Sequence, residues 1–188
     1  MSDTPAHLHP PLAGAQRKPS VRFLLSHPAH AIALGLGSGL APIAPGTVGT
    51  LWAWLAFVAF DEWMDPLQWG GVLLASFIVG WWACTLTARH LAVADPSAIV
   101  WDEVLAFWLV LWLLMPASFW AQLCAFLLFR FFDAAKPGPV AWADSLFKPQ
   151  RDVSGARAIG WRQGFGILFD DLVAALCTLV VISLWRMW

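Results

Sequence analysis

Seven charged residues of this chain lie in three short motifs at the ends of apolar stretches. They are Asp102-Glu103, Arg130, Asp133, Lys136 and Asp170-Asp171. In the middle motif the charges follow at steps of three residues, which places them on one face of a helix. Together the motifs supply five carboxylates and two cations, side chains that can bind a metal ion and a phosphate group.

The composition is that of a membrane protein. Of the 188 residues, 60% are hydrophobic and 12% are charged, whereas soluble domains have about 25% charged residues. The 14 Trp fit side chains that settle at membrane interfaces. The net charge is -1, so the chain shows no electrostatic signature of a nucleic-acid partner. The three Cys lie in apolar runs without a pairing pattern, which predicts no disulfide framework.

Apolar runs predict an all-α membrane bundle of about five helices in one domain, residues 21–188. The expected helices are Val48 to about Phe60, Val72–Leu86, Ala98–Met115, Ala117–Ala135 and Leu172–Leu184. Thr47 and Ser97 are predicted N-caps of the first and third helices. The third would be about 27 Å long at ~1.5 Å per residue, close to the ~30 Å of a bilayer core. Pro137 should end the fourth helix.

A Gly- and Pro-rich segment precedes the first of these helices. Five Gly and two Pro between Ala31 and Thr50 make a continuous helix improbable beyond Gly35. Backbone N–H groups of such a loop could wrap a phosphate, although no Walker motif follows. The alternative is that this segment only connects two helices and binds no ligand.

The distribution of basic residues predicts the orientation. Residues 1–20, expected to be a disordered tail, end in a basic cluster, and the loops at Arg89 and at Lys136–Arg162 are also basic. The loops at Asp61–Trp69 and Met115–Phe119 contain no Lys or Arg. The positive-inside rule then places the tail inside, the C-terminus outside and all three charged motifs at the cytoplasmic face.

These charges at one membrane level suggest a metal and phosphate site. Five carboxylates repel one another unless a cation or protons neutralise them. Oxygen ligands without His or Cys favour a hard ion such as Mg²⁺, and Arg and Lys are the residue types that hold phosphate. The alternative for Asp102, Asp170 and Asp171 is stabilisation of helix N-termini by the macrodipole.

The chain resembles the bacterial phosphatidylglycerophosphatase A family. The resemblance rests on four blocks, which are Gly37-Ser38-Gly39 with Ala44 to Thr50, Ile99 to Glu103, Phe129 to Pro137, and Gly164 to Asp171. It covers about Leu34 to Ala175, whereas the tail has no counterpart and the insert around Lys148–Arg162 is longer than expected. It implies a helical bundle with a central helix, and a Mg²⁺-dependent phosphatase that converts phosphatidylglycerophosphate to phosphatidylglycerol at the bacterial inner membrane.

Roles follow for each motif residue. The predicted metal ligands are Glu103, Asp133, Asp170 and Asp171, and Asp102 is the expected general base or a group supporting the ligands. The predicted phosphate contacts are Thr47, Arg130 and Lys136.

Two other functions are compatible with parts of the sequence. Intramembrane carboxylates also occur in ion- or proton-coupled transporters, but those place them near the bilayer midplane and often show repeats, which this chain lacks. The other alternative is a non-catalytic membrane subunit, in which the five carboxylates would have no function.

Overall fold

The structure, a computed structural model, describes residues 18–147 and 159–187, and these residues contain helices and no strand. In chain order the described helices are α1 (Val21–Leu25), α2 (Pro28–Ala33), the 3₁₀ helix η1 (Gly35–Leu40), α3 (Pro45–Asp61), α4 (Pro66–Leu91), α5 (Trp101–Leu114), α6 (Phe119–Ala135), α7 (Pro139–Leu146) and α8 (Trp161–Arg186). The all-α prediction is confirmed. The prediction of about five helices is wrong, because the described part of the chain has nine, several of them short.

Two predictions fall mostly outside the described residues. The tail prediction concerns residues 1–20, of which 1–17 are not described, and Lys148, Arg151 and Arg157 of the basic insert lie in the gap at 148–158. Ser20 is described, and its side chain caps α1 by accepting a hydrogen bond from the backbone N–H of Phe23. The single domain over 21–188 stays a prediction.

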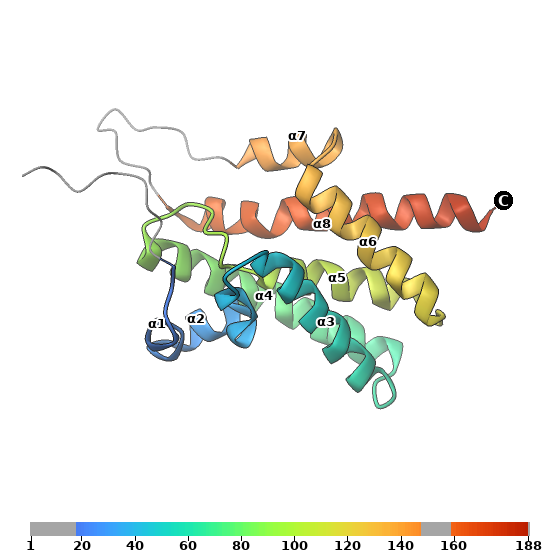
Figure 1. Cartoon of the computed structure of the whole chain (residues 1–188), viewed down its shortest axis with the longest axis horizontal. Helices are drawn as coiled ribbons and strands as arrows, with labels where there is room; N and C mark the ends of the chain where they lie inside the picture. Colours follow the sequence, from blue (N-terminus) through green and yellow to red (C-terminus); the bar gives the residue numbers. More distant parts are fainter. Residues whose placement is uncertain (1–17, 148–158, 188) are drawn as a thin grey trace, which may run out of the picture.

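Helix α5 is the centre of the bundle. It packs against α3, α4, α6 and α8 (Figure 1), and nine of its 14 residues are buried. Phe107, Val104 and Leu111 are fully enclosed. A helix that is apolar on all sides is expected to be buried on all sides, and α5 is apolar from Val104 to its end. The expectation of a central helix is confirmed.

Helix α5 starts later than predicted. Its N-cap is Val100, not Ser97, and it begins at Trp101. The backbone N–H of Val100 donates to the carbonyl of Ala33 at 2.9 Å, so α2 holds the chain in a non-helical conformation up to this point. Asp102 and Glu103 therefore occupy the first turn of the central helix.

Helix α3 starts earlier than predicted. The cap position belongs to Ala44, in a left-handed conformation with φ 48°, and Pro45 is the first helical residue. Proline suits that position because its fixed φ is already helical and its missing N–H has no partner to lose. Thr47 is therefore inside the first turn and is not the N-cap. The prediction that a regular helix does not continue past Gly35 is confirmed, since α2 ends at Ala33.

Helix α8 is much longer than the apolar run Leu172–Leu184. It begins at Trp161 and includes Gly164, where the close approach of α4 leaves no room for a side chain. A Cβ on Gly164 would lie 1.8 Å from the Thr85 hydroxyl oxygen of α4. Asp170 and Asp171 consequently stand well past the first turn, where the helix dipole no longer stabilises a carboxylate. The macrodipole explanation fails for these two residues.

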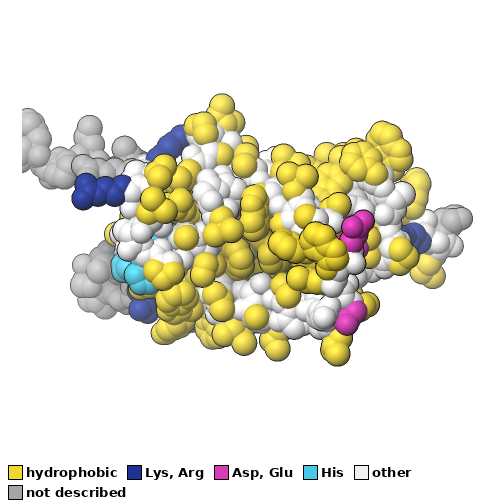
Figure 2. Space-filling model, turned by 90° about the horizontal axis from the view of Figure 1, so that it is seen from below, with side chains coloured by type: hydrophobic (Ala, Val, Ile, Leu, Met, Phe, Trp, Pro, Cys, Tyr) yellow, Lys and Arg dark blue, Asp and Glu magenta, His cyan; other side chains and the backbone are white. Residues whose placement is uncertain are grey.

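Two of the described helices, α4 and α8, are long and apolar enough to cross a membrane. Each has 26 residues, about 39 Å at ~1.5 Å per residue. Helices α3, α5 and α6 have 17, 14 and 17 residues and are shorter, so two helices of the predicted membrane bundle reach this length. Figure 2 shows a largely hydrophobic face, with most of its basic side chains at one end and the acidic ones, with one further basic side chain, toward the other.

Three histidines join the short N-terminal helices to α4. His30 is 3% exposed, its Nδ1 lies 2.9 Å from the carbonyl of Phe23, and its Nε2 lies 2.7 Å from His90 Nδ1. The His27 and His30 rings are 5.5 Å apart. Burial, and then the nearby charges of His90 and His27 when protonated, lower the pKa of His30 below its usual 6.5.

This cluster predicts a loss of stability in acid. An unfolded His takes up a proton near pH 6.5, whereas His30 in the fold resists it, so its stabilising contribution is present above that pH and declines as the pH falls below it. We expect the melting temperature of the wild type to fall relative to that of His30→Gln as the pH is lowered from about 7.5 to 5.5. The measurement is thermal unfolding in detergent at several pH values. Equal slopes for both proteins would contradict this account.

Candidate active site

One cavity of about 340 Å³ collects the charged motifs. It is lined by the start of α3, the connection before α5, the first turn of α5, the end of α6 and the middle of α8. The predicted site residues on its wall are Asp102, Glu103, Arg130, Asp133, Lys136, Asp170 and Asp171. Thr47 does not line this cavity, although its neighbour Gly46 does. The phosphate role of Thr47 stays a prediction.

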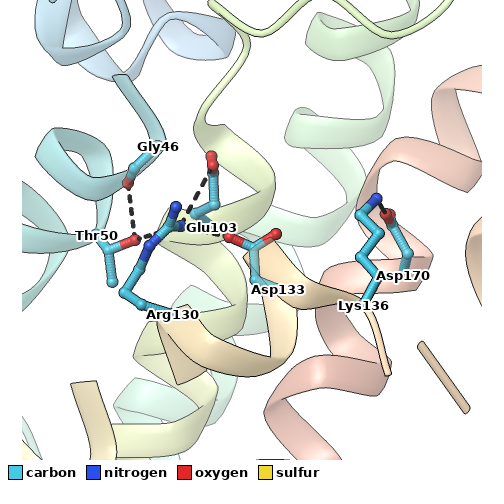
Figure 3. Close-up of polar contacts among 7 residues, drawn as sticks. All are labelled: Gly46, Thr50, Glu103, Arg130, Asp133, Lys136 and Asp170. Atoms are coloured by element: carbon cyan, nitrogen blue, oxygen red, sulfur yellow. Dashed lines mark hydrogen bonds and ion pairs between the residues drawn. The ribbon is translucent and has the colours of Figure 1, made fainter. Parts of the chain in front are cut away.

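Arg130 joins three helices on one side of the cavity (Figure 3). Its Nη1 lies 2.5 Å from Asp133 Oδ2 one turn along α6 and 3.6 Å from Glu103 Oε1 of α5. The same nitrogen donates to the hydroxyl of Thr50 on α3 at 3.3 Å. The Arg130 side chain is 18% exposed, so this cation is largely withdrawn from water.

Lys136 occupies the other side of the cavity (Figure 3) and does not share the face of Arg130 and Asp133. It is the C-cap of α6, with a left-handed φ of 44°, and this turn directs its ammonium toward α8. It pairs with Asp170 of α8 and, at 2.9 Å, with Asp144 of α7. Burial opposes the charge, but the two carboxylates outweigh it and raise the pKa of Lys136. The prediction of one face for the triad is wrong, because the helix ends before Lys136.

Three carboxylates come together on the wall of the same cavity. Asp102, Glu103 and Asp171 each offer an oxygen within 4.8 Å of the others. Asp102 Oδ1, Glu103 Oε2 and Asp171 Oδ2 are buried and have no hydrogen-bond partner among the described residues. A buried carboxylate oxygen without a donor is costly, and a trio of carboxylates that each have such an oxygen fits a hard divalent cation.

The charge balance of the cavity wall supports the same conclusion. Six carboxylates line it, against two cations, a formal excess of four negative charges. Such a wall repels a phosphate dianion unless a cation lies between them. Of the predicted metal ligands, Glu103 and Asp171 belong to the trio with Asp102, whereas Asp133 and Asp170 are paired with Arg130 and Lys136. The predicted ligand set stays a prediction.

Gly46 leaves room for Glu103 at the edge of this site. A Cβ built on Gly46 would lie 2.0 Å from Glu103 Oε1 and 3.1 Å from Arg130 Nη2. No side chain fits there without displacing the carboxylate. The absence of a side chain at Gly46 is therefore a condition for the observed arrangement of Glu103 and Arg130.

Two contacts of the site could not be found from the sequence pattern. Thr50 lies one helical turn after Gly46. The sequence would have placed Thr50 on the same helix face as Gly46 only if α3 had been predicted to start at Pro45. Asp144 lies on α7, a helix inside the stretch from Lys136 to Phe165, whose polar composition predicts a loop. The pattern of α7 is too short for a periodic signal.

A sequence profile described as "Phosphatidylglycerophosphatase A" matches residues 31–186, which include every described residue that lines the cavity. The chain belongs to the phosphatidylglycerophosphatase A family. This membership, with the apolar helices α4 and α8, makes it a membrane protein of an enzyme family, and it does not favour the transporter alternative.

The named relatives of this chain support its membership of the phosphatidylglycerophosphatase A family. The chain is 36% identical to phosphatidylglycerophosphatase A of Escherichia coli K12 over 82% of this chain and 81% of that protein. It is 31% identical to phosphatidylglycerophosphatase A of Haemophilus influenzae over 92% of this chain and 98% of that protein. A Bacteroides thetaiotaomicron protein with the provisional name phosphatidylinositol-3-phosphatase is 30% identical over 82% of this chain and 91% of its own length. No solved structure matches the chain.

Proposed function

We propose that this protein is a Mg²⁺-dependent phosphatase that hydrolyses phosphatidylglycerophosphate to phosphatidylglycerol and phosphate. The observation that carries the proposal is the cavity whose wall holds the carboxylate trio Asp102, Glu103 and Asp171 together with Arg130 and Lys136. The names of the relatives from E. coli and H. influenzae supply the substrate. We further propose that the site lies at the cytoplasmic face of the bacterial inner membrane.

The proposed roles follow from position. Asp102, Glu103 and Asp171 would hold Mg²⁺, which supplies charge neutralisation and lowers the pKa of a water molecule. Arg130 and Lys136 would receive the phosphoryl oxygens from two sides. Asp133 and Asp170 would keep these cations in place, a role that replaces metal ligation for both residues.

The proposed reaction uses one water molecule. The water oxygen attacks phosphorus, and its proton passes to a carboxylate of the site acting as general base. The bond between phosphorus and the glycerol oxygen breaks, the electron pair stays on that oxygen, and a proton completes the alcohol. Arg130 and Lys136 would stabilise the charge on the phosphoryl oxygens during this step.

Phosphate release by the purified protein tests the proposal. Mixed micelles should contain phosphatidylglycerophosphate, phosphatidic acid or phosphatidylinositol 3-phosphate, each with Mg²⁺ or with a chelator. We expect Mg²⁺-dependent release from phosphatidylglycerophosphate above the other two lipids. Release from phosphatidylinositol 3-phosphate alone would reassign the substrate, and release that a chelator leaves unchanged would overturn the metal dependence.

Arg130→Lys distinguishes phosphate binding from structural support. Lysine keeps the positive charge that faces Asp133 and Glu103, so an Arg130 that only neutralised these carboxylates could be replaced by Lys. A guanidinium that binds phosphate cannot be replaced by Lys, because an ammonium group lacks the planar, bidentate arrangement of donors. We expect kcat/KM to fall at least tenfold, about 1.4 kcal/mol, with an unchanged melting temperature. Normal kinetics would remove Arg130 from the phosphate site.

Cysteine labelling tests the proposed orientation. Cys124 is exposed, so the variants need a Cys124→Ser background. Glu62, in the loop between α3 and α4, and Ser145, on α7, are both exposed and lie on opposite ends of the predicted topology. An impermeant thiol reagent added to intact cells should label Glu62→Cys and spare Ser145→Cys. The reverse pattern would place the site at the outer face.

A further inference from the structure

We propose that Thr50 is a positioning residue that fixes the Arg130 guanidinium for phosphate binding. This inference rests on the proposed function of the site. It assigns a task to a residue outside the predicted site set and beyond the wall of the cavity. Thr50 touches Arg130 and would not touch the substrate.

The hydroxyl of Thr50 has a fixed direction. Thr50 is 0% exposed, and its Oγ1 donates its proton to the backbone carbonyl of Gly46 at 2.8 Å (Figure 3). A hydroxyl has one proton and two lone pairs, so the oxygen can only accept from any further partner. Arg130 Nη1, at 3.3 Å, is that partner. The hydrogen bond to the α3 backbone thus orients the Thr50 hydroxyl so that its oxygen accepts from the guanidinium.

The hydrogen bond and the two ion pairs of Arg130 share one nitrogen. Nη1 meets Thr50, Asp133 and Glu103, whereas Nε is buried without a partner among the described residues. Nη2 lies beside Gly46, on the wall of the cavity. Fixing Nη1 therefore sets the direction of Nη2, the nitrogen next to the space that a phosphate would occupy.

Thr50 balances two carboxylates that attract the same nitrogen. Asp133 belongs to the helix of Arg130, and Glu103 belongs to α5, whereas Thr50 approaches from α3. Without the acceptor on α3, the guanidinium is free to turn toward the carboxylates. It would then lose its alignment with the cavity while keeping its charge, which predicts a defect in phosphate alignment without a defect in folding.

Thr50→Val tests this role because it keeps the shape of the side chain and removes the acceptor. Thr178 provides a matched control, since it is also 0% exposed and donates to the carbonyl four residues earlier, that of Ala174, at 2.9 Å. Thr178 has no other hydrogen bond within the described residues. Both Val variants lose the same backbone contact, and only Thr50→Val loses a contact with an arginine. Thr50→Ser retains the hydroxyl.

We expect Thr50→Val to lower kcat/KM about tenfold and to weaken inhibition by inorganic phosphate. Thr178→Val and Thr50→Ser should stay within about twofold of the wild type. In an Arg130→Lys background, adding Thr50→Val should have little further effect, because residues that act through one another are not additive. The measurements are phosphatidylglycerophosphate hydrolysis, phosphate inhibition and melting temperature for the full chain.

The outcomes separate this inference from the proposed function. If the wild type does not release phosphate from phosphatidylglycerophosphate, the proposed function fails. If the wild type is active and Thr50→Val matches Thr178→Val in kinetics, the positioning role is overturned. Full additivity of Thr50→Val and Arg130→Lys would also overturn it. If Thr50→Val unfolds, Thr50→Ala, made with and without Arg130→Lys, provides the same additivity test.

Discussion

Asp171→Asn should reduce kcat by roughly a thousandfold, about 4 kcal/mol of activation free energy. The Asp171 carboxylate is 3% exposed, and its Oδ2 has no donor among the described residues. We infer that this oxygen binds Mg²⁺ with Asp102 and Glu103. An amide keeps the shape of the side chain, but it removes the charge that holds the ion.

The stability of the variant should move in the opposite direction. Without metal, a buried carboxylate next to two others destabilises the fold, so Asp171→Asn should melt at the same or a higher temperature than the wild type. Added Mg²⁺ should raise the melting temperature of the wild type and not that of the variant. Glu62→Gln, in the exposed loop after α3, is the control and should change neither quantity. Near-normal turnover by Asp171→Asn would exclude this residue from the site.

Gly46→Ala should cost about a hundredfold in kcat/KM, about 2.7 kcal/mol. The new methyl group would sit 2.0 Å from Glu103 Oε1, well inside van der Waals contact, so the carboxylate has to move. Because Glu103 belongs to the acidic trio and faces Arg130, both the metal and the phosphate side of the site should be disturbed. Steady-state kinetics with varied Mg²⁺ is the measurement, and the apparent Mg²⁺ requirement should rise.

Gly71→Ala is the matched control for this substitution. Gly71 is also within a helix, and a Cβ built on it meets nothing within 4 Å. Alanine is the better helix former by roughly 1 kcal/mol, so Gly71→Ala should keep full activity and unfold at the same or a higher temperature. Equal activity of the two Ala variants would show that Glu103 can move without consequence, and would sink the role given to Gly46.

The sequence predicted which charged residues come together better than it predicted the helices that carry them. Charged residues are so rare in an apolar chain that Asp102, Arg130 and Asp171 are conspicuous, and a membrane environment makes each of them expensive without a function. Composition and position were therefore enough to find seven residues on the wall of the cavity. Their assignment to metal or phosphate stays a prediction. The ion pairs of Asp133 and Asp170 could not be predicted, because pairing depends on side-chain directions that spacing does not contain.

Helix boundaries were the weakest part of the prediction, and the reasons are tertiary. Val100 stays out of α5 because its N–H bonds to Ala33 on α2, a residue far away in the chain. Gly164 does not mark a helix end, because it is a glycine that leaves room for Thr85 of α4 within α8. Neither contact can be predicted from the local helix propensity of the residues involved. Local propensity likewise did not predict α7, so the contact between Asp144 and Lys136 was not predicted either.

The size of the cavity has a consequence for kinetics in a bilayer. A volume of about 340 Å³ can take a phosphorylated headgroup, but not acyl tails that reach through half of the ~30 Å hydrocarbon core. If the substrate is a diacyl lipid, its tails have to remain among the lipids beside the bundle during turnover. The effective substrate concentration is then a mole fraction within the membrane. Diluting the substrate with inert lipid should slow the enzyme, whereas diluting whole vesicles in buffer should not.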